Sequence, residues 1–328
     1  MLDYPALRAV AAVVQAGSFE RAAKALNVTP SAVSQRVKLL EERLGVVLIE
    51  RGVPCTATER GEWLCRHMEH VGMLETELMA HLPGLVDLSE PTPRVTLNIA
   101  TNSDSLATWF LPAVAAFTRA SDYLLKVAVD DEDHTVEWLQ RGRVLAAVTS
   151  IAKPVQGCRA IPLGALRYHA TASPDYVKRH FAAGVTLEAL QHAPAITFNQ
   201  KDRLQHEWIR RTLGGSIAYP THWLPSTQSF IDASLLGIGW GLNLAKMARA
   251  HLEAGRLVEL IPGAVVDVPL YCQVNRLAAD RLADLTRNIV ETAGRELTRT
   301  ACTTSTSPAR SMSSRPSSPV TSKPKGKA

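Results

Sequence analysis

Apolar residues near the N-terminus recur at helical spacing. In the stretch TPSAVSQRVKLLEERLG, residues 29–45, one stripe is formed by Val33, Val37, Leu40 and Leu44. Spacings of four, three and four place these side chains on one face of an α-helix, where they must meet a core. Thr29 can cap the first free amide groups, Pro30 suits the first helical position, and Gly45 suits the end. The pattern therefore predicts an amphipathic helix whose other face is polar.

Two shorter helices are predicted before this one. The stretch SFERAAKALN starts with Ser18 as a helix cap, and its inner positions are Phe19, Ala22, Ala23 and Leu26. A first helix follows from the apolar positions Leu7, Val10, Val13 and Val14. Residues 27–29 join the second and third helices, which is the connection length of a helix-turn-helix. In that motif the later helix enters the DNA major groove with its N-terminal residues at the base edges.

The polar face of the third helix is suited to reading DNA. Ser31, Ser34 and Gln35 stand where base edges would lie, and a glutamine can form two hydrogen bonds with adenine. Arg36 and Lys38 suit phosphate or guanine. The alternative is a surface helix of a small helical core that has no partner.

The stretch AVVQAGSFERAAKALNVTPSAVSQRVKLLEERLGVVLIERG resembles the N-terminal domain of LysR-type transcriptional regulators, and the match covers essentially all of residues 3–62. The resemblance implies that residues 1–62 form a winged helix-turn-helix that binds a double-stranded DNA operator, with RNA polymerase as a further partner. It implies a wing that follows Leu48. The residues that it adds to the DNA-binding set are Thr29, Pro30 and Arg51. Pro54 stands where many members carry a second wing arginine.

A longer apolar series begins after Thr58. Apolar residues recur every three or four positions in Leu64, Met68, Val71, Leu74, Leu78, Leu82 and Leu85. A helix with such a seam needs a partner, either the rest of its own chain or a second copy. The length of the seam beside a small DNA-binding unit favours a second copy. The resemblance agrees, because it implies that a linker helix over residues 58–87 makes an antiparallel contact in a homodimer or homotetramer.

The periodicity changes after the linker sequence SEPTPR. Alternation over residues 95–99 predicts a strand, and a helix is expected from about Ser105. A strand is expected near residues 124–129, a helix near 134–141 and a strand near 144–149, and further strand and helix units begin at AITFNQKD and STQSF. Repeated strand and helix units indicate two α/β lobes with a cleft between them, over residues 93–298. The predicted fold is therefore an all-α winged helix-turn-helix, a long linker helix and an α/β two-lobed domain, which the resemblance makes a periplasmic-binding-protein-like effector domain.

Positive charge is concentrated at the C-terminal end. Six of the 36 Lys and Arg residues lie in residues 299–328, where no Asp or Glu occurs, so 30 basic and 31 acidic residues remain. Over residues 1–62, eight basic residues stand against seven acidic ones, so DNA affinity must come from their arrangement and from dimerisation. The tail from Ala301 has eight Ser, four Thr and four Pro among 28 residues, and we expect this basic tail to be disordered.

The remaining composition argues for a reduced cytoplasmic protein without metal, cofactor or membrane partner. The cysteines, at positions 55, 65, 158, 272 and 302, form no metal-ligand spacing. No apolar run approaches the roughly 20 residues of a membrane span. The sequence GIGWG lacks the tight turn and helix of a dinucleotide fingerprint, and neither GxSxG nor HExxH occurs. We therefore expect no catalytic residues and no enzymatic activity.

Two junctions between strand and helix are candidate sites for a small ligand. In TNSDSLATW, Ser103 or Ser105 and the free amide groups suit a carboxylate, and PSTQSF has the same character in the other lobe. Helix capping explains either junction equally well. The acidic stretch DDED, residues 130–133, follows the second strand at the same end of its lobe, where it is either a solvated loop or part of the site. Together these features suit a ligand that is anionic at one end and cationic at the other.

A narrower resemblance is carried by NSDSLATWFLPA, VDDEDHTVEWLQRGRVLAAV and RGVPCTATERG, which are similar to the ArgP/LysG (IciA-like) branch of the family. The branch implies an activator of a gene for amino acid export that responds to lysine, arginine or histidine, with L-lysine or L-arginine foremost. The effector-binding residues that it implies are Asn102, Asp104, Ser105, Thr108, Asp131, Asp133, Phe198, Asn199, Ser226 and Thr227. Leu244 stands where many members show proline. The alternative is an architectural or replication-initiation-inhibiting DNA-binding protein that requires no effector.

Overall fold

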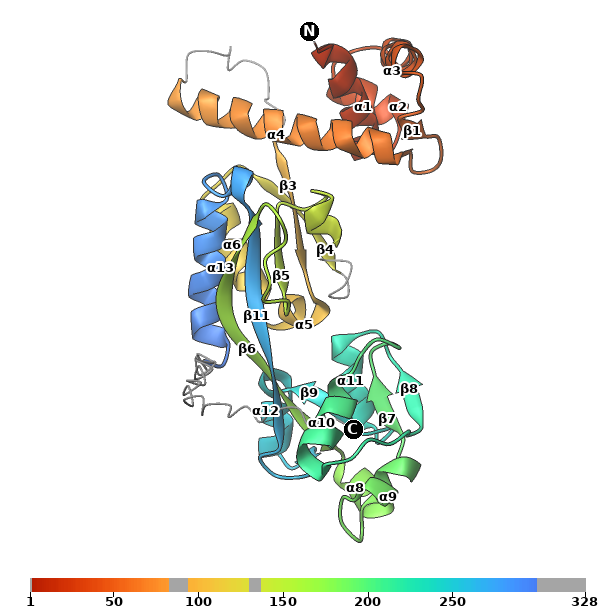
Figure 1. Cartoon of the computed structure of the whole chain (residues 1–328), viewed down its shortest axis with the longest axis vertical. Coiled ribbons are helices and arrows are strands. Elements are labelled where there is room, and N and C mark those ends of the chain that lie inside the picture. Colours follow the sequence, from red (N-terminus) through yellow and green to blue (C-terminus); the bar gives the residue numbers. More distant parts are fainter. Residues whose placement is uncertain (1, 83–93, 130–136, 300–328) are drawn as a thin grey trace, which may run out of the picture.

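The computed structural model describes residues 2–82, 94–129 and 137–299. A small helical domain at the N-terminus leads into the long helix α4, Glu59–His81, which lies across the end of a two-lobed α/β domain (Figure 1). This arrangement confirms the predicted fold class. Asp131, Asp133, the end of the linker segment and the tail from residue 300 lie outside the described residues.

The N-terminal domain contains α1, Tyr4–Ala16, α2, Phe19–Ala25, and α3, Pro30–Leu44. The side chains of Asp3, Ser18 and Thr29 cap the three helices by accepting hydrogen bonds from amide groups three residues later, and the caps at Ser18 and Thr29 were predicted. Their shared core includes Leu7, Val10, Val13, Ala22, Ala23, Val33, Val37 and Leu40. The prediction was wrong for Leu44, which is 48% exposed because it ends the helix beyond the reach of that core.

The wing follows α3 as the antiparallel strands β1, Ile49–Glu50, and β2, Thr56–Ala57. The first turn of α4 packs directly against the segment that enters this wing. A Cβ atom at Gly61 would lie 2.0 Å from the carbonyl oxygen of Leu48, a distance that no real side chain tolerates. Glycine is therefore required where the linker helix leaves the DNA-binding domain.

Helix α4 packs against both of its neighbours. Leu64 and Met68 contact the core of the helix-turn-helix domain, whereas Met73 is buried in the core of the two-lobed domain. Leu74, Leu78 and Leu82 are 52%, 48% and 50% exposed and follow one another at spacings of four. The linker helix thus docks on its own chain and still presents an apolar stripe to solvent.

Polar contacts hold α4 against the two-lobed domain. Arg143 donates to Glu62 over 3.0 Å, and the Nδ2 atom of Asn98 donates to Glu69 over 2.6 Å. On the other side of the helix, Arg8 of α1 donates to Glu75 over 2.6 Å.

Burial at this interface raises the pKa of Glu69 to about 7, although Asn98, Lys126 and Arg66 act in the opposite direction. Between about pH 4.5 and pH 7, the Glu69 carboxyl group is therefore protonated in the folded protein and ionised in the unfolded chain. The stability that this proton contributes is complete below pH 4.5 and is lost as the pH rises through about 7.

We expect Glu69→Gln to weaken the fall of the free energy of unfolding between pH 5 and pH 7 in urea titrations. Glu75→Gln, at the surface of the same helix, is the control and should retain the wild-type profile; equal profiles for all three proteins would contradict the prediction.

The central sheet, as far as it is described, has seven strands in the order β10-β6-β11-β5-β3-β4, with β9 also paired to β6. Its members are β3, Thr96–Thr101, β4, Leu124–Val129, β5, Ala146–Thr149, β6, Cys158–Ala172, β9, Gly241–Leu244, β10, Val258–Glu259, and β11, Val265–Asn275. Strands β4 and β5 flank β3 in parallel, and β11 runs antiparallel to both β5 and β6. Strands β7, Ala195–Thr197, and β8, Thr221–Trp223, form a separate parallel pair.

Strands β6 and β11 connect the two lobes (Figure 1). Their register shifts between Leu270 and Tyr271, opposite Gly164, whose φ is +127°. We use this irregularity as the boundary, so that lobe I comprises residues 94–162 and 271–299 and lobe II comprises residues 163–270. Both connecting strands lay outside the sequence prediction.

Helices cover both lobes. In lobe I they are α5, Ser103–Ser105, the π-helical turn η1, Leu106–Phe110, α6, Leu111–Arg119, η2, Arg276–Ala278, and α13, Ala283–Glu296. In lobe II they are α8, Pro174–His180, α9, Leu187–His192, α10, Leu204–Leu213, α11, Thr227–Leu235, and α12, Ala245–Glu253. The expected strands at residues 124–129 and 144–149 are present, and residues 137–140 are helical as expected.

Candidate DNA-binding and effector-binding sites

The polar face of α3 is presented to solvent at its N-terminal half. Ser31, Gln35 and Lys38 are exposed, and Ser34 and Arg36 are partly buried. Gln35 therefore stands on the accessible face with its amide group available to a partner.

The residues around that face hold the helix start in place. Exposed Pro30 occupies the first helical position, and the Thr29 hydroxyl accepts from the amide of Ala32 and lies 3.0 Å from the Ser31 hydroxyl. The guanidinium of Arg51 lies 5.3 Å from the centre of the Phe19 ring, which places the wing cation beside α2. The predicted contacts on α3 thus lie along its N-terminal and middle turns, and Arg51 lies beside the start of α2.

A cavity of about 620 Å³ lies between the lobes. Lobe I contributes Asn102, Ser103, Asp104 and Ser150, and lobe II contributes residues that include Tyr168, Phe198, Asn199, Lys201, Asp202, Arg203, Glu207, Arg211 and Thr227. The volume is in the usual range for small-molecule sites, and the site lies at the carboxyl end of β3, as expected for an open α/β sheet. Five of the residues implied by the resemblance therefore share this cavity: Asn102, Asp104, Phe198, Asn199 and Thr227.

Asp104 joins the two lobes across the cavity. One of its carboxylate oxygens accepts from the Thr227 hydroxyl over 2.6 Å, and the other accepts from the Tyr168 hydroxyl over 2.6 Å. Burial raises the pKa of Asp104, the two hydrogen bonds partly counteract that rise, and the charge of Asp202 adds to it. The two groups that lower this pKa are neutral hydroxyls. The site therefore holds a carboxylate that would gain stability from a bound cation.

Three residues implied by the resemblance stand away from the cavity wall. Ser105 is fully buried beneath it, because the helix turns its hydroxyl into lobe I. The Thr108 hydroxyl donates back to the carbonyl of Asp104 within its own helix. Ser226 caps α11 by accepting from the amide of Ser229. Helix capping, rather than ligand binding, therefore describes the observed geometry of Ser226.

The backbone of Thr108 has a separate role. Pro112 has no amide hydrogen to donate to the Thr108 carbonyl four residues earlier. That carbonyl instead accepts from Nζ of Lys246 in lobe II over 2.9 Å, and the same ammonium group lies 2.7 Å from Glu296 of α13. Lys246 thus forms a second polar connection between the lobes.

The lobe II wall is shaped by a compact turn. The Asn199 side-chain oxygen accepts from the amides of Lys201 and Asp202, and the Asp202 carboxylate accepts from the amides of Phe198 and Leu204. These bonds hold Asp202 at the cavity wall, where its charge helps to raise the pKa of Asp104.

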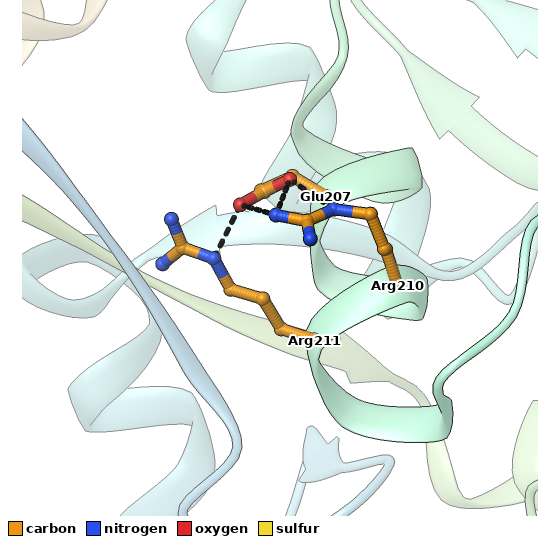
Figure 2. A network of polar contacts seen from close by, with 3 residues as sticks. All are labelled: Glu207, Arg210 and Arg211. Atoms are coloured by element: carbon orange, nitrogen blue, oxygen red, sulfur yellow. Dashed lines mark hydrogen bonds and ion pairs between the residues drawn. The ribbon is translucent and has the colours of Figure 1, made fainter. Parts of the chain in front are cut away.

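Sequence reasoning missed a charged network on α10. Glu207 accepts from Arg210 at both oxygens and from Nε of Arg211, and Figure 2 shows these two consecutive arginines of α10 converging on its carboxylate. Glu207 and Arg211 line the cavity. In the sequence, an acidic residue followed by arginines three and four positions later is typical of any exposed helix surface. Nothing in the local sequence indicated that this helix borders the cleft.

Other site types find no support in the described part of the chain. No group of three or more His, Cys, Asp or Glu side chains there could hold a metal ion. No helix within the same residues is long and apolar enough to span a bilayer. A Cβ at Gly239 would lie 2.9 Å from both the Ile196 side chain and the Pro194 carbonyl, so close packing accounts for glycine in the GIGWG sequence.

Comparison with known proteins gives the same organisation. A model described as the bacterial regulatory helix-turn-helix protein, lysR family, matches residues 5–62, and the LysR substrate binding domain matches residues 91–295. The HTH-type transcriptional regulator ArgP of Pseudomonas aeruginosa is 42% identical over 299 residues, covering 91% of this chain and 98% of that protein.

Two solved structures extend over most of the chain. ArgP from Mycobacterium tuberculosis has 39% sequence identity and a TM-score of 0.73, covering 92% of this chain and 100% of that chain. Full-length LysG from Corynebacterium glutamicum with bound effector Arg has 36% identity and a TM-score of 0.63, covering 90% of this chain and 100% of that chain. Both domains therefore match in the order in which they occur here, and the chain belongs to the LysR family of bacterial transcriptional regulators.

Proposed function

We propose that this regulator binds operator DNA through α3 and its wing, senses a basic amino acid between its lobes, and activates a gene for amino acid export. The observation that carries the sensing step is the Asp104 carboxylate, which lines the cavity together with Asp202 and accepts hydrogen bonds from two neutral hydroxyls. The LysG structure with bound effector Arg supports the same ligand class.

Electrostatics favours a cationic ligand at this position. Asp104 and Asp202 raise each other's energy when both are ionised, and burial adds to the cost of the Asp104 charge. An ammonium or guanidinium group beside them reverses that cost and can form charge-assisted hydrogen bonds. L-arginine and L-lysine supply such a group, and a neutral amino acid offers only its α-ammonium.

The active assembly is proposed to be a homodimer or homotetramer that contacts RNA polymerase at the promoter. The exposed leucines at positions 74, 78 and 82 form a stripe on α4 that a second linker helix would cover. Two helix-turn-helix domains would then reach two half-sites of an operator. Effector binding shifts the balance between lobe arrangements and so alters how the assembly bends DNA.

The proposal is tested by calorimetric titration of the full-length protein with L-lysine, L-arginine, L-histidine, L-glutamate and L-leucine. Saturable binding confined to the cationic amino acids is the expected result. Binding of L-glutamate or L-leucine with equal affinity would remove the charge-based assignment. A complete lack of binding would favour the architectural or replication-inhibiting alternative, which requires no effector. Transcription in vitro from an exporter promoter, with and without the bound amino acid, tests activation.

Substitution of Gln35 tests the orientation of α3 on DNA. A high-affinity duplex is first selected from a randomised pool with the wild-type protein. We expect Gln35→Ala to lose about 5- to 100-fold in its preference for that duplex over random DNA, because one bidentate base contact contributes about 1–3 kcal/mol. Lys38→Ala is the comparison, and it should weaken both duplexes alike. An unchanged preference in Gln35→Ala would remove this residue from the base-reading set.

A further inference from the structure

We propose that Arg211 binds the α-carboxylate of the amino acid effector and that Glu207 holds the arginine in position for this contact. The inference rests on the proposed function, because it assigns the second end of the ligand whose cationic end lies near Asp104. It places a carboxylate-binding group in lobe II, on α10.

The geometry of α10 distinguishes its two neighbouring arginines. Both pair with Glu207, but only Arg211 lines the cavity between the lobes. Arg210 uses Nε and one terminal nitrogen on the Glu207 carboxylate, whereas Arg211 uses Nε. In Figure 2 the two terminal nitrogens of Arg211 point away from Glu207, so its fork of N–H groups remains available. The structure records no other hydrogen bond or ion pair between Arg211 and a described residue.

A guanidinium held in this way is suited to a carboxylate. Its planar N–H groups match the two oxygens of a carboxylate in a bidentate pair, which a lysine ammonium cannot reproduce. The pKa of Glu207 lies below its ordinary value because Arg210 and Arg211 donate hydrogen bonds to it, so Glu207 remains charged and keeps orienting Arg211.

The other cations of the cavity are less suited to this contact. Arg203 also lines the wall but has no side-chain hydrogen bond or ion pair with a described residue that would orient it. Lys201 also lines the cavity, but its ammonium group is a point charge that cannot form the planar bidentate pair with a carboxylate. Arg211 therefore combines access to the cavity, a fixed orientation and free donors.

The chemistry of the two walls then defines the ligand. Carboxylates at positions 104 and 202 receive the cationic group, and the guanidinium at position 211 receives the anionic group. Decarboxylated analogues keep the first contact and lose the second. Agmatine, which is arginine without its α-carboxylate, is therefore the probe that separates the two ends.

The experiment measures the affinities of full-length wild type, Arg211→Gln, Arg211→Lys and the matched control Arg210→Gln for L-arginine, L-lysine and agmatine by calorimetry. We expect Arg211→Gln to lose about 10- to 100-fold for both amino acids, since a hydrogen bond to a charged group is worth about 1.5–3 kcal/mol. Arg211→Lys should recover part of that loss. Arg210→Gln should change the affinities less than about 3-fold, and agmatine should bind wild type and Arg211→Gln alike.

Three outcomes would overturn the inference. Equal losses in Arg210→Gln and Arg211→Gln would show that only the network as a whole matters. An equal loss for agmatine would show that Arg211 does not contact the carboxylate. A wild type that binds none of these amino acids would remove the proposed function and this inference together, whereas either of the first two results would remove the inference alone. Circular dichroism and thermal melting confirm that each variant is folded.

Discussion

Gly61→Ala is expected to destabilise the DNA-binding domain by about 3 kcal/mol, which is the upper end of the usual cost of overpacking. The new Cβ would lie 2.0 Å from the Leu48 carbonyl oxygen and 3.3 Å from the Ala57 side chain, so either the wing or the first turn of α4 must move. Because the nearest atom belongs to the backbone, no change of side-chain rotamer relieves the contact. Urea unfolding of the full-length protein, followed by circular dichroism, measures the loss.

Gly72→Ala is the matched control on the same helix. Its Cβ would lie 3.6 Å from the nearest atom, a Val95 methyl group, which is an ordinary contact. Alanine is preferred to glycine within a helix by about 1 kcal/mol, so this variant should be slightly more stable than wild type. Equal stability of the two alanine variants would show that the close approach at Gly61 is relieved at no cost.

Asp104→Asn is expected to lower the affinity for L-lysine and L-arginine by about 10- to 100-fold, because a charge-assisted hydrogen bond becomes a neutral one. The effect on any neutral amino acid that binds should be smaller. Asparagine has nearly the same shape, and it replaces a carboxylate whose charge is disfavoured by burial. Its amide nitrogen cannot accept from a hydroxyl as the second Asp104 oxygen does, so thermal melting of the unliganded variant is needed to separate a loss of affinity from misfolding.

Thr227→Val is the control for this charge effect. It removes the hydrogen bond to one Asp104 oxygen and leaves the carboxylate charge in place. We expect Thr227→Val to keep the preference for cationic over neutral ligands that Asp104→Asn loses. In wild type, affinity for the cationic ligand should fall as the pH drops through the raised pKa of Asp104, because protonation removes the charge. Equal losses for cationic and neutral ligands in Asp104→Asn would exclude a charge role for this residue.

The DNA-binding half was predictable because its signals are local. Caps at Ser18 and Thr29 and the buried stripe of Val33, Val37 and Leu40 lie within single helices. Strand β6 was missed because it crosses between lobes, and its burial pattern changes from mixed positions to a nearly continuous buried run along its length. A strand that serves two cores shows neither clean alternation nor one hydrophobic block.

The cleft was predictable only in part. Asn102 and Asp104 could be placed because a strand passes directly into a helix there, and ligands bind at the carboxyl ends of such strands. Ser105 is the third residue of α5, and its side chain is fully buried there, which the sequence did not reveal. Arg211 could not be placed from sequence, because its access to the cavity depends on how α10 packs against the distant strand β11.

Strand β3 of lobe I connects the linker helix with the cleft. Its N-terminal half carries Asn98, which binds Glu69 of the linker helix, and its C-terminal end leads within three residues to Asp104. The strand has six residues and spans about 20 Å, and it is paired with β4 and β5 on its two sides. A strand that is hydrogen-bonded on both sides resists extension, so the distance between the cleft and the linker helix is held nearly constant. A ligand that shifted Asp104 along the strand direction would therefore also shift Asn98 and its hydrogen bond to Glu69 of α4.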